Sequence, residues 1–87
     1  MKYRSRIDIT NLILKSTIKG TTKTKIMYKA YLSYAQLKEY LSILVENGLL
    51  EYDEGEQKYK TTSKGIKFMQ VYQHMDTLAG PMTEQLV

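Results

Sequence analysis

Two helical patterns separated by a very short turn constrain the fold of this chain more than any other feature. They cover residues 22–30 and 34–47, and only a turn at Leu32 and Ser33 lies between them. Their inward-facing apolar residues are Ile26, Met27 and Ala30 in the first, and Leu37, Leu41 and Leu44 in the second. Ser33 and Gln36 have the spacing of a capping box that opens the second helix. Two helices that meet at so short a turn are typical of a helix-turn-helix.

The segments on either side complete the pattern. The further elements expected are a helix over residues 6–19, strands over residues 49–53 and 57–61, and a helix over residues 63–79. Ser5 and Asp8 form a capping box at the start of the first of these. Thr62 caps the last helix, which ends at Gly80-Pro81 because the residue before a proline is pushed out of the helical region. The order α-α-α-β-β-α predicts an α+β winged helix-turn-helix.

The length of 87 residues allows one small domain, expected over residues 1–79 and followed by a flexible tail over residues 80–87. A chain of this size has a marginal core, and without Cys no disulfide or thiolate-bound metal supports it. Association with a second copy is therefore expected. Since no apolar run is long enough to span a bilayer and no apolar signal segment opens the chain, we expect a cytoplasmic protein without membrane contact.

Charge is distributed unevenly along the chain, whose net charge is +4. Residues 1–38 hold nine Lys or Arg against Asp8 alone, which gives +8, whereas residues 39–87 hold four Lys against eight acidic residues, which gives −4. A basic half of this kind attracts polyanions, although it can also serve as a solvated surface. Together with the predicted fold, the charge favours nucleic acid as the partner.

The sequence gives little support to catalysis. His74 is the one histidine, there is no Cys, and no nucleophile, zinc or phosphate-loop motif is present. His74 itself falls on the last helix, where a solvated histidine is the simpler interpretation. We therefore expect neither an enzyme nor a bound metal or cofactor.

The start of the second helix of a helix-turn-helix enters the major groove of DNA, which identifies candidate contacts. Ser33, Tyr34 and Gln36 lie there, with Lys38 one turn behind, and they suit base edges or the neighbouring sugar-phosphate. Two alternatives stay open: Gln36 only closes its capping box, and Tyr34 packs on Tyr28 or Tyr31. Acidic residues further along this helix argue against its deep insertion.

Basic residues elsewhere are candidates for phosphate contacts. Lys23 and Lys25 stand at the start of the preceding helix, where backbone amides also attract anions. Lys58 and Lys60 lie on the second strand of the expected hairpin. Arg4 and Arg6 form a short basic arm that either reaches the DNA or frays.

A stripe of apolar residues on the last helix is the second functional signal. It consists of Phe68, Val71, Tyr72, Met75 and Ala79. Ile66 and Met69 are expected to complete the core, which leaves this stripe for the matching helix of a second copy and predicts a homodimer. The alternative is that the stripe covers the first helix within one chain.

Three segments together resemble a known family. They are K-T-K-I-M-Y-K-A-Y-L-S-Y-A-Q-L-K-E-Y-L over residues 23–41, Gly48-Leu49-Leu50, and K-Y-K-T-T-S-K-G over residues 58–65. They resemble the small archaeal winged helix-turn-helix proteins, which include ten-kilodalton Sulfolobus DNA-binding proteins and archaeal transcriptional regulators. The resemblance implies DNA binding without a cofactor and, for chromatin-type members, dimerisation through a long C-terminal helix. Three positions depart from the pattern: an early end to the last helix, Thr61 in place of a larger apolar residue, and Lys29 in place of a frequent glycine.

We therefore expect a double-stranded DNA-binding protein, either a transcriptional regulator or a chromosome-associated protein. A protein of another class remains open, namely a winged-helix interaction module that docks an acidic partner. Binding to single strands or RNA is a third possibility, because eight tyrosines offer surfaces for base stacking.

Overall fold

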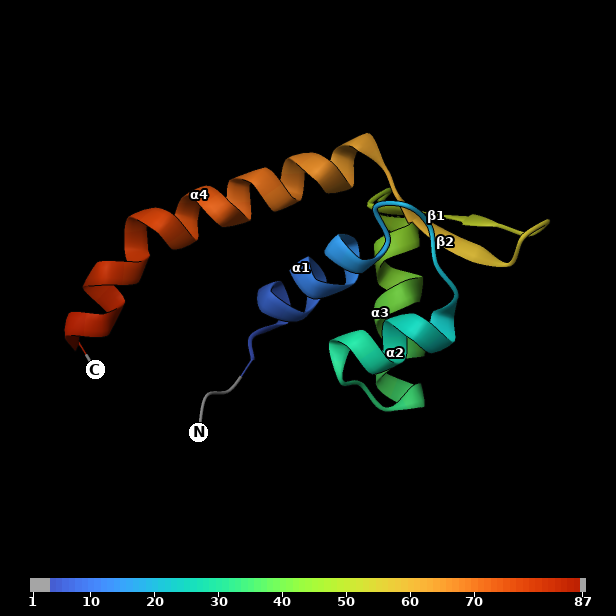
Figure 1. Ribbon diagram of the computed structural model, residues 1–87, viewed down its shortest axis with the longest axis horizontal. Coiled ribbons are helices and arrows are strands. Elements are labelled where there is room, and N and C mark those ends of the chain that lie inside the picture. The colour runs from blue at the N-terminus through green and yellow to red at the C-terminus, as the bar shows by residue number, and fades with distance from the viewer. Residues whose placement is uncertain (1–3, 87) are drawn as a thin grey trace.

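The computed structural model describes the backbone of residues 4–86 and the side chains of residues 4–75, and its elements follow the predicted order. They are α1 (Arg6–Ser16), α2 (Lys23–Ala30), α3 (Tyr34–Glu46), β1 (Leu50–Asp53), β2 (Lys58–Thr61) and α4 (Ser63–Leu86). Figure 1 shows α1, α2 and α3 packed together, the β1–β2 hairpin projecting on one side, and α4 running along α1. This is the α+β arrangement that the sequence predicts.

Local capping explains where the helices begin. At the start of α1 the Asp8 amide donates to Ser5 Oγ at 3.1 Å, and the Ser5 amide donates to Asp8 Oδ2 at 3.0 Å. Ser33 and Gln36 exchange the same two bonds at the start of α3, at 3.1 and 3.2 Å. Each bond satisfies an amide that has no partner inside the helix. Both predicted capping boxes are confirmed.

The core lies between the three N-terminal helices and the base of the hairpin. Its buried residues are Ile13, Leu14, Ile26, Ala30, Leu32, Leu37, Leu41, Leu44 and Leu50. α1 ends at Ser16 instead of residue 19, and the buried Thr17 that follows donates its hydroxyl to the carbonyls of Ile13 and Leu14 at 3.0 Å. Thr17 Oγ1 also lies 2.9 Å from Thr61 Oγ1, so α1 and β2 are joined by a buried polar contact.

The register of the hairpin decides which of its side chains face α3. Leu50 pairs with Thr61 and Tyr52 with Tyr59, so these four residues share one face, since side chains alternate along a strand. Leu50 and Thr61 are buried, which identifies this face as the inner one. Lys58 and Lys60 therefore belong to the outer face. The amide and carbonyl of Tyr59 also bond to Thr21 at 2.8 and 2.9 Å, which anchors the hairpin to the segment before α2.

The start of α4 is fixed against the end of α3 by several polar contacts. Thr62 Oγ1 donates to the Gly48 carbonyl at 2.6 Å and accepts from the Gly65 amide at 3.1 Å. The Lys64 ammonium group donates to the Asn47 carbonyl at 2.7 Å. Gly65 is buried, and a Cβ atom there would lie 2.5 Å from the Leu49 carbonyl oxygen. The segment T-S-K-G over residues 62–65 thus brings α4 against the domain at a site with no room for a side chain.

Two predictions about the last helix are wrong. α4 does not end at residue 79 but continues through Gly80-Pro81 to Leu86, so residues 80–86 are helical and not an irregular tail. A proline inside a helix removes one amide donor and its ring crowds the carbonyl four residues earlier, which kinks the helix without always ending it, and Figure 1 shows α4 changing direction in its C-terminal part. Ile66 does not complete the core and is 43% exposed, whereas Phe68 and Met69 both pack against the core.

Candidate nucleic-acid interface

The N-terminal ends of α2 and α3 lie side by side and bring two lysines onto one tyrosine. The ammonium groups of Lys23 and Lys38 lie 5.4 and 5.8 Å from the ring centroid of Tyr34. Lys23 Nζ is also 3.5 Å from the Tyr34 hydroxyl. Tyr34 is 53% exposed, so the three polar groups are open to solvent. We call Lys23, Tyr34 and Lys38 the basic cluster.

The caps of the two helices hold the backbone of this cluster. Thr22 Oγ1 accepts from the Lys25 amide at 3.4 Å and so fixes the start of α2, one residue before Lys23. Ser33 does the same for α3, one residue before Tyr34. Helix N-termini carry a partial positive charge, so the backbone adds to the attraction of the two ammonium groups for an anion.

The remaining residues predicted at this end of the two helices are placed differently. The Gln36 side-chain oxygen accepts from both the amide and the hydroxyl of Ser33, at 3.1 and 3.2 Å. Ser33 and Gln36 therefore bond to one another, which agrees with the alternative that Gln36 closes the capping box of α3. Lys25 is exposed on α2. The Tyr34 ring interacts with two lysines, Lys23 and Lys38.

A groove runs from the basic cluster between α3 and the inner face of the hairpin. It measures about 380 Å³ and is lined by Lys23, Tyr34, Lys38, Leu41, Ser42, Val45, Glu46, Tyr52 and Tyr59. A second hollow of about 440 Å³ shares Lys23, Tyr52 and Tyr59 with it and reaches Thr24 at the start of α2. The groove has cations at its α2 end and a carboxylate at its other end.

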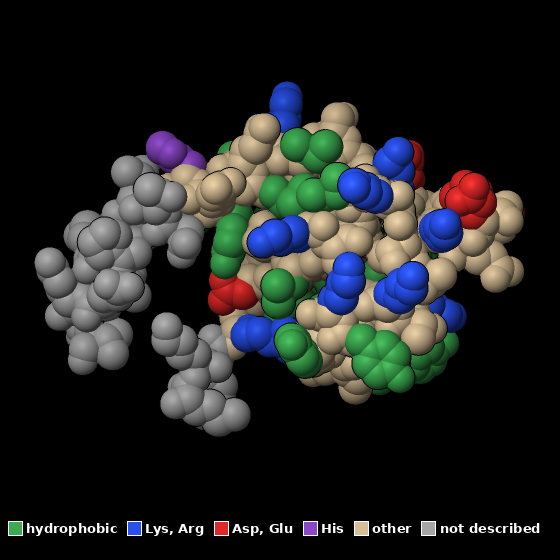
Figure 2. Space-filling model, in the orientation of Figure 1, with side chains coloured by type: hydrophobic (Ala, Val, Ile, Leu, Met, Phe, Trp, Pro, Cys, Tyr) green, Lys and Arg blue, Asp and Glu red, His purple; other side chains and the backbone are tan. Residues whose placement is uncertain are grey.

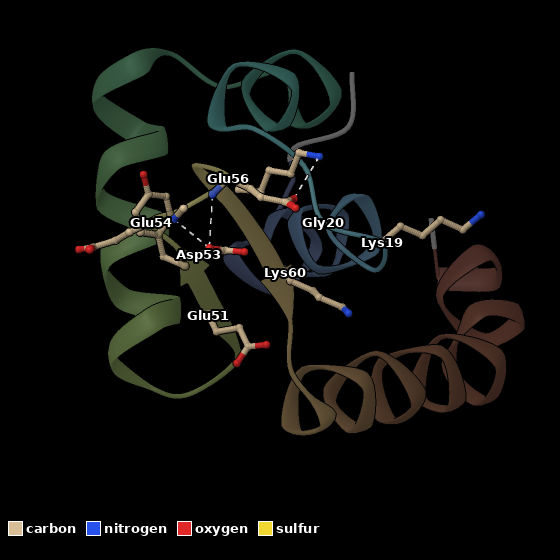
Figure 3. A pocket seen from close by; sticks show the side chains of 10 residues that line it. Lys19, Gly20, Glu51, Asp53, Glu54, Glu56 and Lys60 are labelled. Atoms are coloured by element: carbon tan, nitrogen blue, oxygen red, sulfur yellow. Dashed lines mark hydrogen bonds and ion pairs between the residues drawn. The ribbon is translucent and has the colours of Figure 1, made fainter.

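The hairpin lysines face another part of the surface. Glu51 and Lys60 are cross-strand partners on the outer face, and Figure 3 shows Lys60 pointing away from α3. Lys58 lies 3.5 Å from Glu56 in an ion pair. Both lysines line a hollow of about 680 Å³ together with Lys19 and the acidic residues Glu51, Asp53, Glu54 and Glu56. The structure thus separates Lys58 and Lys60 from Lys23 and Lys38.

The two arginines near the N-terminus contact the protein itself. The Arg4 guanidinium donates to the carbonyls of Ala30 and Tyr31, the latter at 2.9 Å, and lies 5.9 Å from the centre of the Tyr31 ring. It therefore satisfies carbonyls at the C-terminal end of α2. Arg6 lies 3.9 Å from Glu39 of α3 in an exposed ion pair.

Basic side chains also cover the face formed by α1 and α2. Figure 2 shows Lys and Arg distributed over these helices, with few acidic groups among them. The four lysines Lys15, Lys19, Lys25 and Lys29 are exposed, and Asp8 is the only acidic residue in the first 38 positions. The positive field of the domain is therefore broader than the basic cluster.

The apolar stripe of α4 divides into two parts. Phe68 packs on the core, and the Tyr72 hydroxyl donates to Asp8 Oδ1 at 2.6 Å, so these two residues cover α1 within the chain. Val71 and Met75 are 58% and 52% exposed. Ala79 lies outside the side chains that the structure describes.

Hydrogen bonds lower the pKa of the Asp8 carboxyl: the one from the Tyr72 hydroxyl has the largest effect, and the one from the Ser5 amide has the next largest.

Within residues 4–75 no three His, Asp or Glu side chains gather where a metal ion could bind. None of the helices, as far as they are described, has the length and apolar character needed to cross a bilayer.

Tyr52 and Tyr59 are the groove residues that sequence reasoning missed. Their rings lie 4.7 Å apart between centroids at an interplanar angle of 43°. The signal was the alternation of Tyr with charged residues along both strands. This alternation alone does not predict that the two tyrosines line a groove, because the sequence does not tell which face of the hairpin is buried.

Comparisons with known proteins agree with this arrangement. A family model described as winged helix-turn-helix matches residues 3–80. The crystal structure of Sso10a-2, a DNA-binding protein from Sulfolobus solfataricus, superposes with a TM-score of 0.81 at 21% sequence identity, over 94% of this chain and 88% of that one. No curated protein matched the chain.

Proposed function

Because this chain belongs to the winged helix-turn-helix family, we propose that it binds double-stranded DNA through the basic cluster and the first turns of α3. The observation that carries the proposal is the convergence of Lys23 and Lys38 on Tyr34 where two helix N-termini meet. The structurally similar Sulfolobus protein is itself a DNA-binding protein, which supports the same reading.

Phosphate contacts supply most of the affinity in this proposal. Two ammonium groups, the Tyr34 hydroxyl and the amides at the start of α2 form a cradle for the sugar-phosphate backbone. Glu39 and Glu46, further along α3, repel phosphates, so only the N-terminal part of α3 approaches the duplex. Lys25 is exposed two residues further along α2 and, in this proposal, adds to the positive field around the cradle.

Gel shifts on unrelated duplexes over a range of salt concentrations test the proposal. The logarithm of the association constant should fall with the logarithm of salt by about 0.9 per phosphate neutralised. Lys23→Ala should flatten the slope by roughly one unit for every sequence, whereas Lys67→Ala, on exposed α4, should leave it unchanged. A protein that shifts no duplex at low salt would refute the proposal. Preference for a single-stranded competitor would refute its duplex specificity.

A role as a transcriptional regulator or a chromosome-associated protein follows from this binding, and we propose a cytoplasmic location on the chromosome. Footprinting on long duplexes distinguishes the two roles. A regulator protects discrete sites at low occupancy, whereas a chromosome-associated protein covers the duplex without sequence preference.

We also propose a homodimer formed through α4. Ile66, Val71 and Met75 are the exposed apolar residues of its described part that lack a role in the core, and Val71 and Met75 lie nearer its C-terminal half, which Figure 1 shows extending beyond α1. Val71→Glu should convert a dimer into a monomer in light scattering, while Gln70→Glu on the same turn should not. A monomeric wild type at micromolar concentration would refute the dimer.

A further inference from the structure

We infer that the groove between α3 and the hairpin holds one sugar-phosphate strand of the duplex, and that Tyr52 is the residue with which the hairpin contacts it. This inference rests on the proposed function and adds a strand path and a contact residue to it. It also replaces Lys58 and Lys60 as the hairpin residues nearest the DNA.

Tyr52 is presented to the groove by a rigid support. It is 43% exposed and leans on the ring of Tyr59, its cross-strand partner. Tyr59 is half-buried against the core and is bonded to Thr21 through both its amide and its carbonyl. The Tyr52 ring therefore has one side packed on Tyr59 while the residue still lines the groove beside α3.

Duplex geometry brings a strand to this place. A recognition helix in the major groove, which is about 12 Å wide, has a sugar-phosphate strand on either side of it. The hairpin lies beside α3, so the strand on that side must cross the space between them. The groove of about 380 Å³ is this space, and its cationic end is the basic cluster.

The chemistry of the lining suits a backbone better than an unpaired base. Two ammonium groups already lie over the Tyr34 ring, so a base cannot stack there without displacing a lysine. Tyr52 and Tyr59 already pack on each other. What these side chains leave free are hydroxyl groups, which donate to phosphate oxygens, and ring edges, which pack on deoxyribose.

The outer face of the hairpin is unsuited to the same task. Lys58 and Lys60 alternate across the strands with Asp53 and Glu51, and Lys58 is paired with Glu56. A phosphate on that face would meet as many carboxylates as ammonium groups.

This difference makes the inference testable by salt dependence. A lysine contact releases a counterion, so its loss lowers the affinity and flattens the salt slope. A tyrosine contact is uncharged, so its loss lowers the affinity and leaves the slope unchanged. The two kinds of hairpin contact therefore give different results in one titration.

The experiment measures the affinity for a duplex of random sequence at several salt concentrations. We expect Tyr52→Ala to weaken binding about tenfold at every salt concentration, and Tyr52→Phe, which keeps the packing on Tyr59, about threefold. Tyr28→Ala removes an exposed tyrosine outside the groove and should bind like the wild type. If Tyr52→Ala fails to fold by circular dichroism, Tyr52→Phe alone decides.

Wild-type affinity in Tyr52→Phe and Tyr52→Ala would overturn the inference while leaving DNA binding intact. A flattened slope for Lys60→Ala would overturn it in favour of the outer face. A larger loss for single-stranded than for duplex DNA would show that Tyr52 stacks on a base instead. Failure of the wild type to bind any duplex would refute the proposed function itself, so the two failures are distinguishable.

Discussion

Replacing Gly65 by alanine tests whether close packing fixes the start of α4. Alanine exceeds glycine in helix propensity by about 1 kcal/mol, so at an open helical position the substitution raises stability. At Gly65 the new Cβ atom would lie 2.5 Å from the Leu49 carbonyl oxygen, 3.2 Å from Thr61 Cγ2 and 3.4 Å from Leu14 Cδ2. Contacts under 3.0 Å essentially never occur for real Cβ atoms, so the backbone must move.

We expect this movement to outweigh the gain in propensity. Overpacking costs about 1–3 kcal/mol, and the Leu49 carbonyl cannot move freely because it accepts from the Thr62 amide at 3.1 Å. The closest contact is with backbone, so the cost belongs in the upper half of this range, roughly 2–3 kcal/mol. After the gain of about 1 kcal/mol in propensity, the net loss is roughly 1–2 kcal/mol, which corresponds to a fall in Tm of roughly 5–15 °C for a domain of this size.

Thermal unfolding followed by circular dichroism, at one protein concentration and without DNA, measures the change. Gly55→Ala is the matched control, because a Cβ atom at this exposed hairpin tip meets only the Asp53 side chain, at 3.3 Å. Its stability should stay within about 0.5 kcal/mol of the wild type. A Gly65→Ala protein as stable as the wild type, or more stable, would refute the packing argument, since the two effects have opposite signs.

Two further substitutions probe polar contacts. Tyr72→Phe should cost about 1 kcal/mol at pH 7, because it removes the hydrogen bond that the Tyr72 hydroxyl donates to the Asp8 carboxylate. This hydrogen bond lowers the pKa of Asp8, so the stability it contributes is present above the pKa of Asp8 in the unfolded chain and is lost as pH falls through the lower pKa of the folded protein. Urea unfolding at low pH should therefore show no difference from the wild type. Thr61→Val should change stability by less than about 1 kcal/mol in urea unfolding. The substitution removes the hydroxyl that donates to the Leu14 carbonyl at 2.8 Å, but this carbonyl still accepts from the Thr17 hydroxyl. A much larger loss of stability would mean that the two hydroxyls act as one unit.

The helix starts could be predicted because capping is a local effect. Ser5, Thr22 and Ser33 each bond to an amide three residues further on, and such pairs are visible in the sequence. The end of α1 could not be predicted in this way. α1 stops early at a threonine that bonds to Thr61, more than forty residues away in sequence, and nothing near Thr17 announces this.

The faces of the hairpin could not be predicted. The charge of Lys58 and Lys60 predicts phosphate contacts, yet a shift of one residue in register moves every side chain to the other face. The register is set by burial of Leu50 and Thr61 against the core. Thr61, a departure from the family pattern, fits because its hydroxyl donates to the Leu14 carbonyl.

The apolar stripe of α4 shows a similar limit. Helical spacing correctly places Phe68, Val71, Tyr72 and Met75 on one broad side. It does not tell which of them meet α1, because that depends on the angle at which α4 leaves β2. The contacts of Thr62 and Lys64 with the end of α3 set this angle, so Phe68 and Tyr72 turn inward and Val71 and Met75 stay exposed.

The distribution of charge along α3 gives the proposed interface a direction. Lys38 lies in the first half of the helix beside Lys23, while Glu46 lies at its last residue and at the far end of the groove. A phosphate strand in the groove is attracted at one end and repelled at the other, so the duplex must tilt away from the C-terminal end of α3. Tyr52 lines the same groove and has neither a basic nor an acidic side chain. An uncharged contact is suited to this position, because it holds the strand without drawing it toward Glu46.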